Sequence, residues 1–219
     1  MTIRVLLADD QPLIRAGFHV LLDSAPDLEV VGEASDGLEA LDLLRTTRAD
    51  VVVMDIRMPL LDGLETTRRI TSDESFAGVK VLVVTTFEID EYVARAVEAG
   101  ASGFLGKGVE PAELQAAVRT VAEGDALLSP KATKALIDRF LTRGSGVPVD
   151  PGRLDVLTQR EREVVALAAH GMSNNEMAEK LVVSPLTVKT HVNRAMMKLQ
   201  ARDRAQLVVV AYQTGLVRF

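Results

Sequence analysis

Residues 49–59 read Ala49-Asp50-Val51-Val52-Val53-Met54-Asp55-Ile56-Arg57-Met58-Pro59. Four apolar residues, three of them β-branched, predict a short buried strand over 51–54. The apolar run stops at Asp55, and Pro59 prevents a strand ladder from continuing. Asp55 therefore stands at the carboxyl end of a buried strand, where open α/β sheets carry their chemistry.

Strand-like and helix-like patterns alternate through residues 1–123. The predicted strands are Ile3–Ala8, Leu28–Ala34, Val51–Met54, Val79–Val84 and Gly103–Leu105. The predicted helices are Pro12–Leu22, Leu38–Arg45, Leu64–Ile70, Tyr92–Ala99 and Ala112–Val121. Five βα units in series predict a parallel sheet with helices on both faces. Right-handed crossovers favour an α/β, flavodoxin-like (βα)5 domain with strand order 2-1-3-4-5.

Polar residues follow four of these five strands. Asp9 and Asp10 follow the first strand, Asp55 the third, Thr85 the fourth and Lys107 the fifth. Because the carboxyl ends of parallel strands meet at one sheet edge, we expect these side chains to share a pocket. Clustered carboxylates repel one another unless a cation lies among them, and oxygen ligands suit Mg²⁺ rather than zinc.

Composition separates the chain into two parts of opposite charge. Residues 1–150 carry 15 Lys and Arg against 25 Asp and Glu, net −10, and residues 151–219 carry 10 against 6, net +4. The second part is therefore a candidate for contact with a polyanion. No apolar run reaches the roughly 18 residues of a membrane span, so no membrane partner is expected. The absence of cysteine excludes disulfides and thiolate chemistry and fits a cytoplasmic protein.

Residues 124–153 join these two parts. Ser129-Pro130 is suited to begin a helix, and Ala132–Leu141 carries apolar residues at helical spacing. The following segment, Thr142–Gly152, is rich in Gly and Pro and has no periodicity, which predicts a flexible tether. The expected domains are therefore 1–123, a linker over 124–153, and 154–219.

The C-terminal part shows helix-start signals in close succession. Thr158–Glu161 and Ser173–Glu176 have the spacing of capping boxes, and Ser184-Pro185 is a third helix start. A fourth helix fits Asp203–Gln213. A short second helix, a tight turn and a longer third helix predict a helix-turn-helix within a small all-α, four-helix domain.

The third of these helices has two predicted faces. The apolar side is assigned to Leu186, Val188, Val192, Ala195, Met196 and Leu199. Another face carries Lys189, Thr190 and Asn193, which are suited to read base edges in a major groove. Thr187, Arg194 and Lys198, with Arg202 beyond them, are candidates for phosphate contacts.

Several motif residues of the first domain form a known pattern. They are Asp9-Asp10, Asp55 with Met58-Pro59 and Asp62-Gly63 after it, Thr85, Phe104 and Lys107. With them, residues 3–122 resemble the receiver domain of two-component response regulators. The resemblance implies that Asp55 accepts a phosphoryl group from a sensor histidine kinase or a small phosphodonor. It also implies that Asp10, Asp55 and the backbone carbonyl of Arg57 hold Mg²⁺, with Asp9 assisting through water.

The same resemblance implies a conformational switch. Thr85 and Phe104 look like the switch pair, in which the hydroxyl moves toward the phosphoryl group and the ring turns inward. Lys107 would offset charge on that group. The chain departs from many receivers at Gly108, where they have Pro after the lysine. Phe87, like Arg57, flanks the pocket where such proteins vary.

The C-terminal motifs also form a known pattern. They are Leu157-Thr-x-Arg-Glu-x-Glu163, Gly171-Met-Ser-Asn174, Glu176-Met-Ala178, Thr187-Val-Lys-Thr-His191 and Lys198-Leu199. Over residues 155–213 they resemble the LuxR-type helix-turn-helix. With the receiver, the whole chain is similar to the NarL/FixJ family of response regulators. Asn193 stands where some members carry Lys, which leaves the base preference open.

These features predict a phosphorylation-controlled, DNA-binding transcription regulator rather than an enzyme. Its expected partners are a sensor histidine kinase, double-stranded promoter DNA and, on phosphorylation or DNA binding, a second copy of the chain. Val208, Val209 and Tyr212 of the last helix form a candidate dimer surface, with burial in the core as the alternative.

Two rival functions remain open from the sequence. The first is a phosphorylation-independent DNA-binding regulator with a vestigial receiver. The second is a Mg²⁺-dependent phosphohydrolase that passes through an aspartyl-phosphate, although the sequence offers no separate general acid or base for it.

Overall fold

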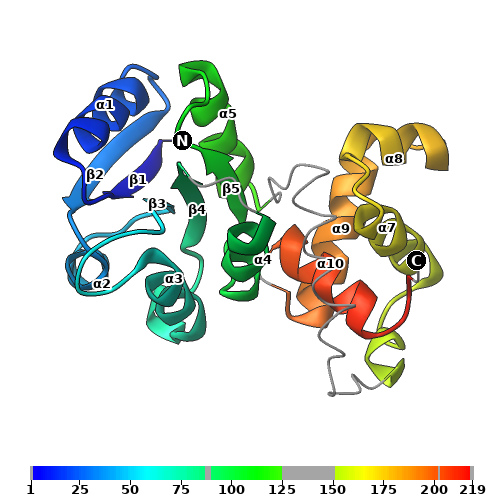
Figure 1. Cartoon of the computed structure of the whole chain (residues 1–219). Coiled ribbons are helices and arrows are strands. Elements are labelled where there is room, and N and C mark those ends of the chain that lie inside the picture. The colour runs from blue at the N-terminus through cyan, green and yellow to red at the C-terminus, as the bar shows by residue number, and fades with distance from the viewer. Residues whose placement is uncertain (1, 87–89, 125–150, 202, 218–219) are drawn as a thin grey trace. The chain divides into compact units, whose positions relative to one another are not determined.

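The computed structural model describes residues 2–86, 90–124, 151–201 and 203–217. They form two compact units, one before and one after residues 125–150 in the sequence, whose elements are coloured along the chain in Figure 1. Each unit has its own hydrophobic core. Among the described residues, no helix combines the length and the hydropathy that crossing a bilayer requires.

The first unit is built on a five-stranded parallel sheet. Its strands are β1 (Ile3–Ala8), β2 (Leu28–Ala34), β3 (Val51–Met54), β4 (Lys80–Thr85) and β5 (Gly103–Gly106). Their order is β2-β1-β3-β4-β5, which confirms the predicted topology. Strand β4 begins and ends one residue later than predicted, so Thr85 belongs to the strand itself.

Helices cover both faces of this sheet (Figure 1). They are α1 (Pro12–Asp23), α2 (Gly37–Thr46), α3 (Gly63–Ser72), α4 (Asp90–Glu98) and α5 (Pro111–Ala122), with a short 3₁₀ turn, η1 (Glu74–Phe76). Alternate residues along a strand point to opposite faces, which gives the unit two cores. Val53 and the other strand residues on its face pack with α1 and α5. Val52 and the strand residues on the opposite face pack with α2, α3 and α4. The near-continuous apolar strands of the sequence reflect this burial on both faces.

The second unit is helical. It contains a 3₁₀ turn, η2 (Pro151–Leu154), followed by α7 (Gln159–Ala169), α8 (Asn174–Leu181), α9 (Pro185–Leu199) and α10 (Arg204–Gln213). Both predicted capping boxes are present, because the side chains of Thr158 and Ser173 each accept a hydrogen bond from the backbone N–H of the glutamate three residues later. Ser184 caps α9 in the same way, through Thr187 N. The predicted helix-turn-helix is therefore formed by α8 and α9.

Two predictions about the helical unit were wrong. Leu186 was assigned to the apolar side of α9, but it is 74% exposed, while Val188, Val192, Ala195, Met196 and Leu199 form the buried side. Leu186 lies in the first turn of α9, on the side of the helix away from those five residues. Val208 was offered as part of a dimer surface, but it is only 4% exposed in the core. The alternative of burial is the correct one for Val208.

Some predicted features fall outside the described residues. These are the helix over Ala132–Leu141, most of the tether that follows it, and the side chains of Phe87 and Arg202. The linker therefore stays a prediction from the sequence.

The turn between α8 and α9 contains a strained residue. Val182 has φ +53° and ψ +51°, in the left-handed region that β-branched residues avoid. Its side chain is 89% exposed, so little packing offsets the strain. The conformation lets Val182 end α8 by donating its N–H to carbonyls of the last turn.

We expect Val182→Asn to stabilise the helical unit by about 1 kcal/mol, because asparagine tolerates the left-handed region and no buried contact is lost. The measurement is denaturant unfolding followed by circular dichroism. Val183→Asn is the matched control. It removes a side chain that packs against the core and should be destabilising. A lower midpoint for Val182→Asn would contradict the strain argument.

Candidate functional site

The register of the sheet brings the predicted pocket residues to one edge. Ala8 of β1 pairs with Met54 of β3, so Asp9 and Asp55 follow the strands side by side. Thr85 pairs with Gly106, and the next residue, Lys107, donates its backbone N–H to Thr85 O at 2.8 Å. The expectation that these strand ends converge is met by the geometry.

Lys107 lies between two buried carboxylates. Its Nζ is 2.7 Å from Asp9 Oδ2 and 2.9 Å from Asp55 Oδ2, and the side chains of all three residues are 5% exposed. The other oxygens of the two acids accept backbone hydrogen bonds, Asp9 Oδ1 from Gln11 N at 2.9 Å and Asp55 Oδ1 from Ile56 N at 2.8 Å. The carboxylates are therefore held in fixed orientations at the sheet edge.

Burial and charge pairing act against each other in this pocket. It raises the pKa of Asp55 above the ordinary value, the hydrogen bond from Lys107 opposes that rise, and the neighbouring charge of Asp9 adds to it. Burial also acts to lower the pKa of Lys107, but its hydrogen bonds to Asp9 and Asp55 outweigh that effect, and the pKa is raised. The amine therefore stays positively charged, because the two carboxylates beside it favour its protonated form.

The acidic cluster fits a divalent cation. One oxygen from each of Asp9, Asp10 and Asp55 lies within 4.8 Å of the others, and Asp10 is exposed to solvent. Three carboxylates and one ammonium carry a formal net charge of −2. All three acids offer hard oxygen ligands, and the exposed side leaves room for water, which is the environment that Mg²⁺ prefers.

The residues predicted to form the switch are both buried. Thr85 is fully buried at the end of β4, and Phe104 of β5 packs in the core with Val93 and Ala96 of α4. Among the described residues no peptide bond is cis, so Lys107–Gly108 is trans. The switching itself stays a prediction.

A network that the sequence did not reveal supports Asp9 from α1. Arg15 Nη1 donates to the backbone carbonyl of Asp9 at 2.6 Å, and its Nε donates to Glu33 Oε2 at 2.9 Å. Glu33 Oε1 is also 2.5 Å from His19 Nδ1. The hydrogen bond with Glu33 raises the pKa of His19 above its ordinary value, against the effect of burial. Sequence periodicity does not reveal these hydrogen bonds, because the partners lie on another element or on the backbone.

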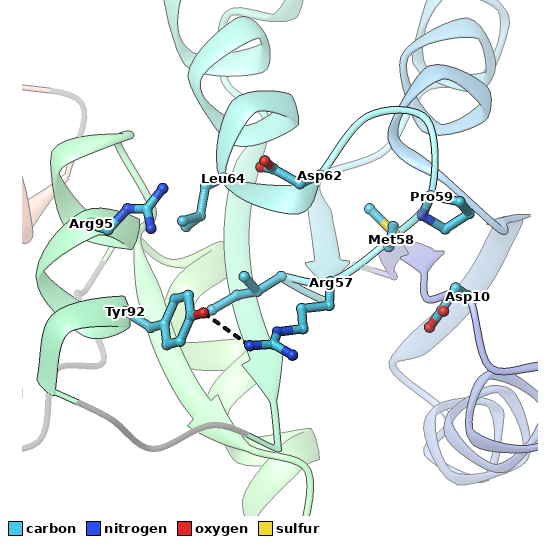
Figure 2. A pocket seen from close by; sticks show the side chains of 9 residues that line it. Asp10, Arg57, Met58, Pro59, Asp62, Leu64, Tyr92 and Arg95 are labelled. Atoms are coloured by element: carbon cyan, nitrogen blue, oxygen red, sulfur yellow. Dashed lines mark hydrogen bonds between the residues drawn. The ribbon is translucent and has the colours of Figure 1, made fainter.

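An open hollow of about 440 Å³ borders the acidic cluster. Asp10, Asp62, Met58 and Pro59 line one part of it, and Arg57, Tyr92 and Arg95 line the part near α4 (Figure 2). Arg57 Nη2 donates to Tyr92 Oη at 3.2 Å. The guanidinium carbons of Arg57 and Arg95 lie 6.0 and 5.9 Å from the centre of the Tyr92 ring, within the range of cation–π attraction. The structure thus adds Tyr92 and Arg95 to the surroundings of the predicted pocket.

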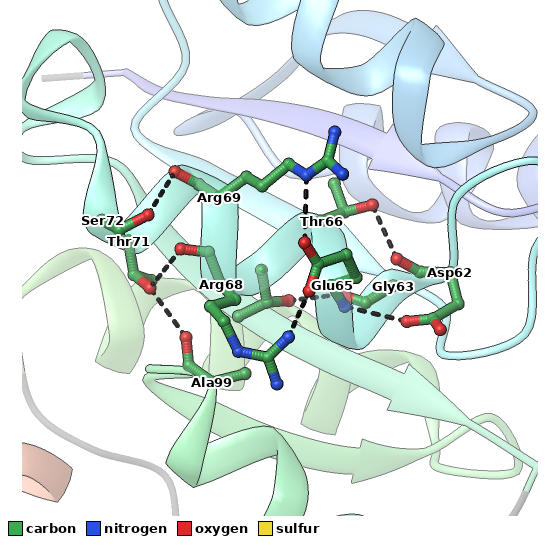
Figure 3. A network of polar contacts seen from close by, with 10 residues as sticks. Asp62, Gly63, Glu65, Thr66, Arg68, Arg69, Thr71, Ser72 and Ala99 are labelled. Carbon is green, nitrogen blue, oxygen red and sulfur yellow. Dashed lines mark hydrogen bonds and ion pairs between the residues drawn. The ribbon is translucent and has the colours of Figure 1, made fainter.

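The start of α3 lies directly against Asp55. Gly63 donates its N–H to Ile56 O at 2.9 Å, and a Cβ on Gly63 would lie 1.8 Å from the carbonyl oxygen of Asp55. Asp62 caps the helix by accepting from Glu65 N at 2.8 Å, and Glu65 pairs with Arg68 and Arg69 one turn later (Figure 3). Glycine is required at position 63 by this close approach to the backbone of Asp55.

Most of the predicted DNA-contacting residues lie on the outer side of α9. Thr190, Asn193 and Arg194 are exposed, and Lys189 is half-buried. Thr187 is half-buried, and its hydroxyl is 2.8 Å from that of Ser184 at the helix cap. The helix thus presents the predicted reading residues on one surface, although their contacts with DNA stay a prediction.

Lys198 has a partner within the unit. Its Nζ is 2.7 Å from Oε2 of Glu161, whose side chain is 3% exposed. Burial acts to raise the pKa of Glu161, but hydrogen bonds from Lys198 and the backbone N–H of Thr158 outweigh it and hold the pKa below its ordinary value. Lys198 therefore ties α9 to the N-terminus of α7, a role that the sequence did not indicate.

Comparison with known proteins identifies both units. Residues 5–119 match the family of response regulator receiver domains, and residues 155–211 match the luxR family of bacterial regulatory proteins. The chain is 40% identical to the uncharacterized transcriptional regulatory protein YxjL of Bacillus subtilis, over 99% of this chain and 98% of that protein. It is 39% identical to the transcriptional regulatory protein LiaR of the same organism, over 98% and 99%.

A solved structure is also similar. The response regulator ChrA of a heme-sensing two-component system matches with a TM-score of 0.52 and 38% identity, over 99% of both chains. The likeness therefore extends across both units rather than one of them.

We expect Gly63→Ala to destabilise the first unit by about 1–3 kcal/mol, because the added methyl group overlaps the carbonyl of Asp55. Gly17→Ala is the matched control. Position 17 lies inside α1 with nothing within 4 Å of an added Cβ, so this change should stabilise the helix by up to about 1 kcal/mol. Denaturant unfolding measures both effects. Equal midpoints for the two variants would contradict the close approach at Gly63.

Proposed function

The chain belongs to the response regulators that join a receiver domain to a luxR-type DNA-binding domain, and from this premise we propose that phosphorylation of Asp55 controls its binding to promoter DNA. The protein is a phosphorylation-controlled, DNA-binding transcription regulator. The observation that supports Asp55 as the acceptor is its position in the acidic cluster, 2.9 Å from Lys107. We assign residues 1–123 to the receiver, 124–153 to the linker and 154–219 to the DNA-binding domain.

In the proposed reaction a carboxylate oxygen of Asp55 bonds to phosphorus as the bond from phosphorus to the donor's leaving group breaks. For a sensor histidine kinase that leaving group is an imidazole nitrogen. Lys107 holds a positive charge beside the developing acyl phosphate, and Thr85 offers its hydroxyl at the end of β4. Asp9, Asp10, Asp55 and the carbonyl of Arg57 would hold Mg²⁺. The ion, when bound, neutralises negative charge on the phosphoryl oxygens.

The proposed consequence is a change in the surface of the receiver. A new dianionic group at Asp55 would draw on the positive charge of Lys107, which now contacts both Asp9 and Asp55. Thr85 and Phe104 are proposed to carry that change away from the pocket. A phosphorylation-induced homodimer remains part of the proposal, without Val208 as a surface residue.

The proposed DNA interface is the outer side of α9. Lys189, Thr190 and Asn193 would reach base edges, and Thr187 and Arg194 would contact phosphates. Lys198 is a weaker candidate than the sequence indicated, because its ammonium already pairs with Glu161. Since the C-terminal part of the chain carries net +4, attraction to the DNA backbone supports the same assignment.

The curated relatives are transcriptional regulators rather than enzymes. The two rival functions make different predictions from this proposal. If the protein were a phosphohydrolase, it would turn over small phosphate esters many times. If its receiver were vestigial, its affinity for DNA would be the same with and without phosphorylation. A cytoplasmic location stays a prediction from the sequence.

We expect the full chain to gain one phosphoryl group on incubation with acetyl phosphate and Mg²⁺, as measured by intact-protein mass spectrometry. Asp55→Asn should abolish the gain, because the amide is a poor nucleophile, and chelation of Mg²⁺ should abolish it in the wild type. Asp42→Asn is the matched control, since Asp42 is exposed on α2 and should leave uptake unchanged. Phosphate uptake that persists in Asp55→Asn would move the acceptor to another residue.

Two substitutions on α9 should affect different properties of DNA binding, one the preference for a specific site and the other the affinity for all sequences. Lys189→Ala should lower the preference for the specific site over random DNA by roughly 5- to 150-fold, the effect of losing one base contact. Arg194→Ala should weaken binding to all sequences alike and reduce the slope of log affinity against log salt by about 1. Fluorescence anisotropy over a salt series measures both. Unchanged site preference in Lys189→Ala would contradict its base-reading role.

A further inference from the structure

Leu186 is an exposed apolar residue on a helix whose outer side is otherwise polar or basic over its first half. It is the second residue of α9 and is 74% exposed. A single exposed leucine is common on protein surfaces and by itself indicates nothing. Its neighbours on the helix, and its place in the fold, give it a more specific meaning.

Leu186 shares one side of α9 with the proposed reading residues. Positions 186, 189, 190, 193 and 197 follow one another at intervals of one to four residues that place them on one face. The buried residues Val188, Val192 and Ala195 lie on the other side, against the core. Leu186 therefore points away from the core, with Asn193 two turns further along the same face.

The centre of this face has few hydrogen-bond donors. Thr190, one turn after Leu186, donates its hydroxyl to the carbonyl oxygen of Leu186 at 2.9 Å. With that proton used inside the helix, Thr190 offers a base only an acceptor and a methyl group. Leu186 and Thr190 together thus form a small patch suited to apolar contact, with Lys189 and Asn193 beside it.

The position of Leu186 along the helix also matters. Residues at the N-terminal end of a recognition helix are those that reach base edges in the major groove. Leu186 and Asn193 are about 10.5 Å apart along the axis, which corresponds to about three base-pair steps. Met197 is also exposed, at 72%, but it lies near the C-terminal end of α9.

We propose that Leu186 is a specificity-determining residue that contacts the 5-methyl group of a thymine in the major groove. The methyl group of thymine is the one apolar feature that bases display in that groove. The inference rests on the proposed use of α9 as the recognition helix and adds a base preference to it. The site recognised by the protein should therefore contain a thymine near the base pairs contacted by Lys189 and Asn193.

The test removes a single methyl group from the DNA. The full chain is first phosphorylated with acetyl phosphate and Mg²⁺. DNA duplexes that bind it are then selected from a randomised pool. Each thymine of the selected site is then replaced in turn by deoxyuridine, which lacks only the 5-methyl group. At one thymine per half-site, the wild type should lose affinity about fourfold, the effect expected for one buried methyl group.

Leu186→Ala should bind the thymine and deoxyuridine duplexes equally at that position. Met197→Ala is the matched control, an exposed apolar residue of the same helix, and it should keep the fourfold ratio. Because Leu186 is exposed, its replacement should leave the circular dichroism spectrum and melting temperature unchanged. A Leu186→Ala variant that keeps the wild-type ratio would overturn the inference, as would a wild type that ignores the methyl group at every thymine.

The selection step separates this inference from the proposed function. If the wild type enriches no sequence from the pool, sequence-specific DNA binding is wrong, and the role of Leu186 is wrong with it. If a sequence is enriched but its methyl groups have no effect, the DNA-binding function stands and only the role of Leu186 is excluded.

Discussion

The first unit depends on the compensation of two buried carboxylates by one ammonium group. Asp9 and Asp55 are nearly removed from solvent, and isolated charges in that environment would be costly. The contacts of Lys107 with both acids reduce this cost, but they require the ends of β1, β3 and β5 to stay in register. The same contacts would be disturbed by any charge added to Asp55, because Lys107 is shared between the two acids. In the proposed function, a phosphoryl group would act through this shared contact.

The surroundings of this site limit how far its parts can move. The approach of Gly63 fixes the start of α3 against the backbone of Asp55, and Arg15 fixes the backbone of Asp9 from α1. With the backbones of both acids held in this way, a response to phosphorylation under the proposed function would pass through Lys107 and Thr85 to β4 and β5.

Much of this arrangement could be predicted from the sequence because it follows from the order of the segments along the chain. The alternation of apolar strands and amphipathic helices determined a five-stranded parallel sheet, and the residue after each strand determined what meets at its edge. The helix-turn-helix was equally accessible, since the caps at Thr158, Ser173 and Ser184 are local signals. Periodicity and helix caps depend on residues only a few positions apart, so both can be recognised from the sequence alone.

Only the tertiary structure decided which side of an element is covered and which polar groups become partners. Val208 belongs to the helix proposed as a dimer surface, yet it is buried in the core of its own unit. The exposure of Leu186, by contrast, follows from helical spacing, which places it away from the buried residues of α9. Arg15 with Glu33 and Lys198 with Glu161 join segments far apart in the chain. Periodicity tells which residues share a face, but the packing of other elements determines whether that face meets the core or the solvent.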